Sequence, residues 1–132
     1  MKAKATHLKT GRKGEAMAVR QLRRCGYQIL RTNYSLEHIG EIDIIARDGG
    51  TLCFIEVKTR HQNKTHDISP AQAIDSKKRQ RIAKCAKYFL KKYSLMHCPF
   101  RFDIAEVILN KHFWQHQIII RPHAFGESSP KL

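Results

Sequence analysis

Two acidic residues interrupt apolar segments near the middle of the chain. Asp43 lies within the segment from Glu41 to Arg47, and Glu56 lies within the segment from Thr51 to Lys58, with isoleucine or valine on both sides of each acid. Both segments are rich in β-branched residues and predict β-strands. A carboxylate inside an apolar strand is costly unless another group pairs with it. The two acids are therefore the first candidates for a functional site.

A glycine pair predicts how these two strands meet. The tripeptide Asp-Gly-Gly at 48–50 separates the segments, and Gly-Gly between two strands is a strong hairpin signal. If the two glycines form a two-residue turn, Asp48 pairs with Thr51 and the numbers of all paired residues sum to 99. Asp43 then lies directly opposite Glu56, with the two Cβ atoms about 5 Å apart on one face. A three-residue loop would instead place the two acids on opposite faces.

The same register assigns the neighbouring residues to faces. Glu41 falls opposite Lys58, and we expect it to pair with Lys58 or Arg60 rather than to join the acid pair. The residues expected on the other, core-facing side are Ile42, Ile44, Ile55 and Val57. An alternative reading makes the charged residues a solvent-facing ladder across the strands, in which each pair contributes a few tenths of a kcal/mol. Spacing alone leaves both readings open.

Two carboxylates so close together have a limited set of uses. They repel each other, so either one takes a proton or a cation lies between them. Hard oxygen ligands in a site open to phosphate favour Mg²⁺ or Mn²⁺. Lys58 follows Glu56 by two residues and so projects from the same strand face, where it could stabilise charge on a phosphate or orient the attacking water. Together these residues predict a metal-assisted phosphodiester hydrolase.

The overall charge points to a polyanionic partner. The chain has 132 residues, with 25 Lys and Arg against 11 Asp and Glu, which gives a net charge of +14. Nucleic acid is the expected polyanion, because neutralisation of phosphates by Lys and Arg dominates such binding. No apolar run reaches the roughly 20 residues that span a bilayer, and no apolar segment follows the basic start, so we expect no membrane partner and a cytoplasmic protein.

The pattern of the rest of the chain predicts one α/β domain. We expect a flexible basic arm at residues 1–9, a single domain at 10–125 and a flexible tail at 126–132. Helices are predicted from Thr10 to Cys25 and from Ser69-Pro70 to Tyr93. Strands are predicted at 27–34, 41–47, 51–58, 101–109 and 117–121. This order favours a mixed sheet flanked by helices.

Several motifs resemble an uncharacterised bacterial family often called YraN. The residues that carry the resemblance are Gly14-Glu15, Gly40-Glu41-Ile42-Asp43, Phe54-Ile55-Glu56-Val57-Lys58-Thr59-Arg60, Arg101-Phe102-Asp103 and Ala124-Phe125. They span roughly residues 11 to 125, and the two motifs around Asp43 and Glu56 are highly specific. The family in turn resembles PD-(D/E)XK nucleases with the restriction-endonuclease-like fold, particularly archaeal Holliday junction resolvases.

This resemblance implies roles for particular residues. Asp43 and Glu56 match the two motif acids that hold Mg²⁺, and Lys58 matches the motif lysine. Glu15 matches a helix glutamate that several such nucleases add to the metal site; without the resemblance it would be read as a first-turn helix acid. Lys78 falls where the family tends to keep a lysine, and we expect it to face the substrate. The proline of the first motif is absent, because Ile42 precedes Asp43.

Basic residues in two segments are the expected nucleic-acid contacts. These are Arg12 and Lys13 near the N-terminus, and Lys77, Lys78 and Arg81 in the second predicted helix. The resulting hypothesis is a Mg²⁺- or Mn²⁺-dependent endonuclease that acts on DNA, with branched or structured DNA as the expected substrate. Its rival is a non-catalytic module that binds DNA or RNA on a nuclease-like fold, since a fold does not prove an activity. Junction resolvases act as dimers, so a homodimer is a further expectation of the resemblance.

Overall fold

A computed structural model of the protein describes residues 2–61, 75–110 and 116–126, with side chains from residue 11 onward. Its elements are α1 (Lys2–Arg24), β1 (Gln28–Leu36), β2 (Gly40–Asp48), β3 (Thr51–His61), α2 (Ser76–Lys92), β4 (Phe100–Leu109) and β5 (Gln117–Phe125). The strands form one sheet in the order β1-β2-β3-β4-β5, in which β3 and β4 are parallel and the other neighbours antiparallel. The mixed sheet with two helices confirms the predicted α/β class and is compatible with a restriction-endonuclease-like core.

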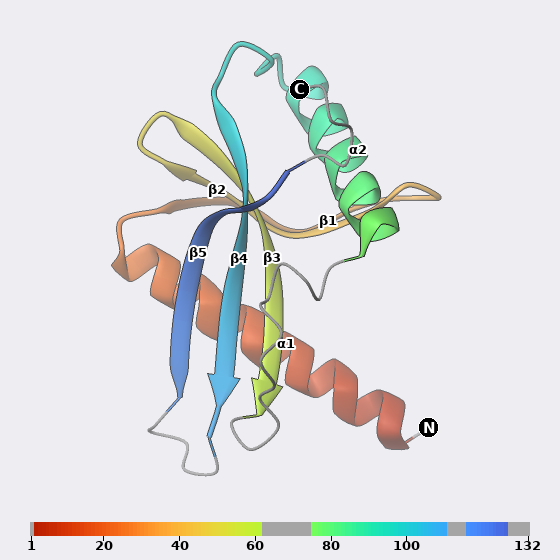
Figure 1. Cartoon of the computed structure of the whole chain (residues 1–132), viewed down its shortest axis with the longest axis vertical. Helices are drawn as coiled ribbons and strands as arrows, with labels where there is room; N and C mark the ends of the chain where they lie inside the picture. The colour runs from red at the N-terminus through yellow and green to blue at the C-terminus, as the bar shows by residue number, and fades with distance from the viewer. Residues whose placement is uncertain (1, 62–74, 111–115, 127–132) are drawn as a thin grey trace.

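Each face of the sheet packs against one helix. α1 crosses one face behind β3, β4 and β5, and α2 lies against the other face near the top of the molecule in Figure 1. The cluster on the α1 side is built on Leu22, Ile44 and Ile55, and the cluster on the α2 side on Phe54 and Phe89. Burial of these apolar side chains, at about 25 cal/mol per Å² removed from water, is the main force that holds the layers together.

The two-sided core corrects one expectation from the sequence. Ile42 was expected to share a face with Ile44 and Ile55, but it packs in the α2-side cluster while Ile44 and Ile55 pack on the α1 side. Ile42 and Ile45 are three residues apart and still contact the same cluster. Strict alternation along a strand would put them on opposite faces, so the side chains of β2 do not alternate strictly between Ile42 and Ile45.

The helices begin at different residues from those predicted. α1 already starts at Lys2 rather than at Thr10, because its first residues include alanine and lysine, which are good helix formers. Whether residues 1–9 move as an arm stays a prediction. α2 starts at Ser76, where the Asp75 side chain accepts a hydrogen bond from the Lys78 backbone N–H at 2.8 Å. The predicted start at Ser69-Pro70 and residues 127–132 of the predicted tail lie outside the described residues.

Two glycines have positions that few other residues could take. Gly49 has φ 62°, the left-handed conformation that a tight hairpin turn requires. Gly14 lies where α1 crosses β3, and a Cβ atom at this position would overlap the Thr59 hydroxyl and lie 3.2 Å from Thr59 Cβ. The missing side chain thus lets α1 approach β3 closely and places the next residue, Glu15, near the middle of the sheet.

Candidate functional site

The two acids lie where β2 separates from β3. The ladder between these strands runs from Asp48 paired with Thr51 to Ile44 paired with Ile55, so the predicted register that sums to 99 is confirmed. Asp43 and Glu56 are the next residues along each strand. Beyond this point β2 continues beside β1 while β3 continues beside β4, and Figure 1 shows the hairpin of β1 and β2 turning away from β3.

Asp43 is held at this fork by a backbone group of β3. Its Oδ2 atom accepts a hydrogen bond from the Val57 N–H at 2.8 Å. Burial, together with the neighbouring charge of Glu56, raises the pKa of the Asp43 carboxyl to about 8. The two acids therefore do lie together, and near neutral pH the pair tends to hold a proton unless a cation compensates the second charge.

Glu56 is buried and paired with two lysines. Its side chain is 4% exposed, which does not fit a solvent-facing ladder. Glu56 Oε2 forms an ion pair with Lys78 Nζ and lies 3.7 Å from Lys58 Nζ. Lys58 follows Glu56 on the strand as predicted, whereas Lys78 comes from the first turn of α2, which its Asp75 cap fixes in place. The structure thus brings both acids and both lysines into one cluster.

The two lysines differ in their electrostatic environment. Burial and the adjacent charge of Lys78 lower the pKa of Lys58. Burial acts on Lys78 in the same direction, but its hydrogen bond and charge interaction with Glu56 outweigh this, so the pKa of Lys78 is raised. Lys78 is therefore the lysine that more readily stays protonated beside Glu56. Lys58 gives up its proton more easily and is better suited to hold or transfer a proton near a water molecule.

Glu15 approaches the pair from the opposite side of the sheet. Burial raises the pKa of Glu15, a hydrogen bond with Asn33 opposes that rise, and the charges of Glu41 and Glu56 add to it. Glu15 is thus within electrostatic reach of Glu56. In the part of the chain that the structure describes, no group of three or more His, Cys, Asp or Glu side chains is arranged to hold a metal ion. Of the three acids predicted to hold a metal, the structure therefore brings Asp43 and Glu56 together, whereas Glu15 has a hydrogen bond with Asn33 and interacts with Glu56 only through its charge.

Glu41 does not make the contacts expected of it. Among the ion pairs of the described residues, Lys58 pairs with Glu56 and Arg60 pairs with Glu106, and Glu41 takes part in neither. The reason is the fork: the register that would bring Glu41 opposite Lys58 ends at Ile44, and Glu41 instead pairs with Ser35 of β1 in the ladder.

The predicted nucleic-acid contacts fall on two grooves. Arg12 lines a groove of about 740 Å³ between α1 and β1, which also includes Glu15. Lys77 and Arg81 line a smaller groove of about 280 Å³ between α2 and the turn that joins β1 to β2. Lys13 is exposed on α1 next to Arg12. The structure thus spreads these residues over two helices: Lys78 forms an ion pair with Glu56, and the charge of Arg12 acts on Glu15.

Comparison with known proteins assigns the chain to a family. Residues 14–107 match the model of "Uncharacterised protein family UPF0102". The chain belongs to the UPF0102 family. A UPF0102 protein of Caldicellulosiruptor saccharolyticus is 40% identical over 76% of this chain and 82% of its own length. Those of Koribacter versatilis and Chlorobium chlorochromatii are 45% and 46% identical, over 80% and 74% of this chain and 72% of each relative.

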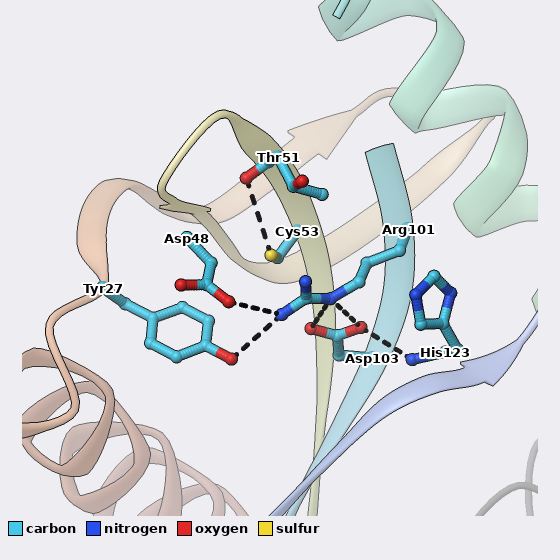
Figure 2. A network of polar contacts seen from close by, with 7 residues as sticks. All are labelled: Tyr27, Asp48, Thr51, Cys53, Arg101, Asp103 and His123. Atoms are coloured by element: carbon cyan, nitrogen blue, oxygen red, sulfur yellow. Dashed lines mark hydrogen bonds and ion pairs between the residues drawn. The ribbon is translucent and has the colours of Figure 1, made fainter. Parts of the chain in front are cut away.

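The motif Arg101-Phe102-Asp103 of this UPF0102 chain builds a buried ion-pair network. Asp103 is fully buried, and Arg101 Nε lies 3.0 Å from both of its carboxylate oxygens. Arg101 Nη2 also donates to Tyr27 and Asp48, and Asp103 Oδ1 accepts from the His123 N–H at 3.1 Å (Figure 2). The network joins β4 to β2, to β5 and to the segment after α1. It lies on the α1 side of the sheet and is a structural feature.

Glu106 of the UPF0102 chain is a further buried acid, and it is not among the candidate residues predicted from the sequence. Glu106 is 3% exposed and pairs with Arg60 and Arg121. The signal that marks Asp43 and Glu56, an acid inside an apolar strand, is also present at Asp103 and Glu106. The same pattern in β4 thus marks both residues as candidates for buried, paired acids.

No helix in the described part of the chain is long and apolar enough to cross a bilayer.

Proposed function

We propose that this UPF0102 chain is a metal-dependent endonuclease that hydrolyses phosphodiester bonds in DNA. The observation that carries the proposal is the contact between Asp43 and buried Glu56, beside Lys58 and Lys78, in a chain with net charge +14. Paired carboxylates with adjacent lysines on a strongly basic protein suit a reaction at a phosphate group, which carries negative charge before and during the attack by water.

The donor set suits a hard divalent cation. Asp43 and Glu56 would hold Mg²⁺ or Mn²⁺, and Glu15 would support it from the other side. The raised pKa of Asp43 is the supporting observation, because a pair that tends to share a proton is a pair whose repulsion a cation would relieve. When bound, such an ion supplies a water of lowered pKa and neutralises charge on the phosphate.

Lys58 and Lys78 would have different roles at the site. Lys78 neutralises Glu56 in the absence of substrate, which allows a carboxylate to stay buried without strong destabilisation. Lys58, whose pKa is lowered by burial and by Lys78, would orient the attacking water or stabilise charge on the phosphate. The two roles predict different losses: Lys78 variants should affect stability and activity together, and Lys58 variants chiefly activity.

The basic grooves favour DNA as the substrate. The groove that contains Arg12 also contains Glu15, so it leads toward the acid pair, and the groove of Lys77 and Arg81 lies on the same helix as Lys78. Phosphate contacts from such side chains position a duplex without reading its sequence. We propose branched or structured DNA as the preferred substrate because the family resembles junction resolvases, and a homodimer as the acting species for the same reason.

A non-catalytic binding module is the second candidate. The observation that favours it is the ion pair between Glu56 and Lys78, since a carboxylate already neutralised by a lysine can be purely structural. In that case Asp43, Glu56 and the lysines form a buried polar network that fixes the strand fork, and DNA or RNA binds through the basic grooves alone.

Cleavage and binding of a DNA panel separate the two candidates. The panel contains linear, single-stranded, flapped and four-way DNA, each with Mg²⁺ or Mn²⁺. The endonuclease proposal expects cleavage that Asp43→Ala abolishes, with DNA affinity unchanged or raised because a negative charge near phosphate is removed. Identical background for wild type and Asp43→Ala on every substrate would support the binding module. A large loss of affinity in a folded Asp43→Ala variant would contradict the placement of Asp43 at the phosphate.

A further inference from the structure

Glu106 of β4 holds two arginines that come from the strands on either side. Arg121 of β5 donates from Nη2 to Glu106 Oε1 at 3.0 Å and from Nε to the same oxygen at 3.3 Å. Arg60 of β3 donates from Nη2 to the other oxygen, Oε2. Each carboxylate oxygen therefore fixes one guanidinium group, and the buried position of Glu106 fixes the carboxylate.

This cluster lies on the same face of the sheet as Glu56 and Lys58. Lys58 is the ladder partner of Glu106, and Arg60 stands two residues further along β3. Arg121 is paired with Ile104, two residues from Glu106, so its side chain shares that face. Because Lys58 lies two residues beyond Glu56, the Glu106 carboxylate that holds both arginines is displaced from Glu56 by about 6.6 Å along the strands. This displacement is close to the distance between successive phosphates along one nucleic-acid strand.

Stability alone is a poor reason for such a cluster. Apolar residues in place of a buried ion pair are often as stable or more stable, because charges are costly to remove from water. Two arginines against one carboxylate also leave a net positive charge. The Arg121 side chain is 46% exposed and that of Arg60 is 25% exposed. A guanidinium has five N–H donors, so both arginines keep donors beyond those that Glu106 uses, and a phosphate group accepts such donors in pairs.

We infer that Arg60 and Arg121, positioned by Glu106, bind a backbone phosphate one step along the strand from the phosphate at the acid pair. The inference rests on the proposed function for the identity of the ligand, a nucleic-acid strand. It adds a second phosphate site, which uses residues outside the acid and lysine cluster. Two fixed phosphates would set the register of the strand, so that a single phosphate lies at Asp43 and Glu56.

A salt titration of DNA binding tests the site. The full chain, its Arg121→Gln variant and the control Arg47→Gln are titrated with a short fluorescein-labelled DNA duplex in EDTA, so that no cleavage occurs. Arg47 is an exposed arginine at the other end of the sheet, where β2 pairs with Leu52. Loss of one phosphate contact lowers the slope of log affinity against log salt by about 0.9. We expect this change, with about a tenfold loss of affinity, in Arg121→Gln and not in Arg47→Gln.

Duplexes with one neutral methylphosphonate locate the phosphate. The wild-type chain should bind more weakly when the methylphosphonate replaces the phosphate that Arg60 and Arg121 contact. The affinity of Arg121→Gln should not change when the same phosphate is replaced. Glu106→Gln keeps both arginines charged, so it should retain the wild-type salt slope while its DNA affinity falls. Arg121→Lys keeps the positive charge, so it should have the wild-type salt slope but only part of the wild-type affinity.

Two failures would have different meanings. If Arg121→Gln matches Arg47→Gln in slope and keeps the wild-type methylphosphonate pattern, the inference is overturned, whether or not the chain cleaves DNA. If the Arg121→Gln results are as expected but no cleavage depends on Asp43, the phosphate site stands and the endonuclease proposal fails.

Discussion

The Val57 backbone N–H donates a hydrogen bond to Asp43 Oδ2 at 2.8 Å, at the point where the ladder between β2 and β3 ends. A side chain of one strand thus takes the place of a backbone partner on the other. Because Val57 directly follows Glu56, this bond fixes the Asp43 carboxyl beside the Glu56 carboxyl. The acid pair is therefore held by two strands of the sheet and does not depend on a loop.

The acid pair should make stability depend on pH. The pKa of Asp43 is raised to about 8 in the folded chain, against roughly 4 when unfolded. Its contribution to stability is therefore complete below about pH 4 and is lost as the pH rises through about 8. With EDTA present, Asp43→Asn should gain stability relative to wild type between pH 5 and pH 9, as measured by thermal unfolding. Parallel pH profiles for the two proteins would contradict the buried pair.

A divalent cation should stabilise the folded chain through the same pair. A ligand that binds only the folded state raises the midpoint of unfolding by mass action. At pH 8, millimolar Mg²⁺ or Mn²⁺ should raise the melting temperature of wild type, and Glu56→Gln should remove this rise. Glu37→Gln is the matched control, because Glu37 is exposed on the turn after β1 and forms an ion pair with the equally exposed His38. An equal rise in all three proteins would indicate unspecific binding.

A side chain at position 14 should destabilise the chain, whereas a side chain at position 11 should not. A Cβ atom at Gly14 would overlap the Thr59 hydroxyl, whereas one at Gly11 meets nothing within 4 Å. Gly11→Ala should stabilise the chain by up to about 1 kcal/mol through helix propensity. Gly14→Ala should destabilise it by about 1–2 kcal/mol, and Thr59→Ala in the same chain should recover part of the loss. Urea unfolding measures all three, and equal effects of the two alanines would argue against a tight α1–β3 contact.

The Arg101–Asp103 pair should matter for folding and not for chemistry. Asp103 is fully buried, so Arg101→Met would leave an uncompensated carboxylate at a cost of about 3–5 kcal/mol. The double variant with Asp103→Leu should recover much of this loss, because no buried charge then remains. Unfolding curves give these values. A loss below 1 kcal/mol for Arg101→Met, on the scale of an exposed pair, would contradict the buried network.

Local sequence patterns predicted the centre of the site well. The Gly-Gly turn and the alternation of side chains are short-range features, and they placed Asp43 beside Glu56 and Lys58 on the same strand as Glu56. Contacts between distant elements were not predictable in this way. Lys78 meets Glu56 because Asp75 begins α2 at one particular residue, and that start decides which residue of the first turn faces the sheet.

The fork and the arginine partners of the buried acids show the same limit. Nothing in the sequence of β2 indicates that its ladder with β3 ends at Ile44, so the expected contact of Glu41 with Lys58 was wrong. Glu106 is an acid in an apolar strand, but its partners Arg60 and Arg121 lie 46 and 15 residues away. Which arginines pair with a buried acid depends on strand order, and strand order is a property of the whole fold.

Endonuclease activity at the acid pair can be measured in a cleavage time course with the DNA of the panel that the wild type cleaves fastest. Wild type, Asp43→Asn and the control Glu37→Gln are compared in Mg²⁺ at protein concentrations that saturate the DNA. We expect cleavage by wild type and a rate within twofold of it for Glu37→Gln. For Asp43→Asn we expect a rate lower by about 100-fold or more, with DNA binding retained. Cleavage by Asp43→Asn at the wild-type rate, or no cleavage by any of the three, would contradict the proposed function.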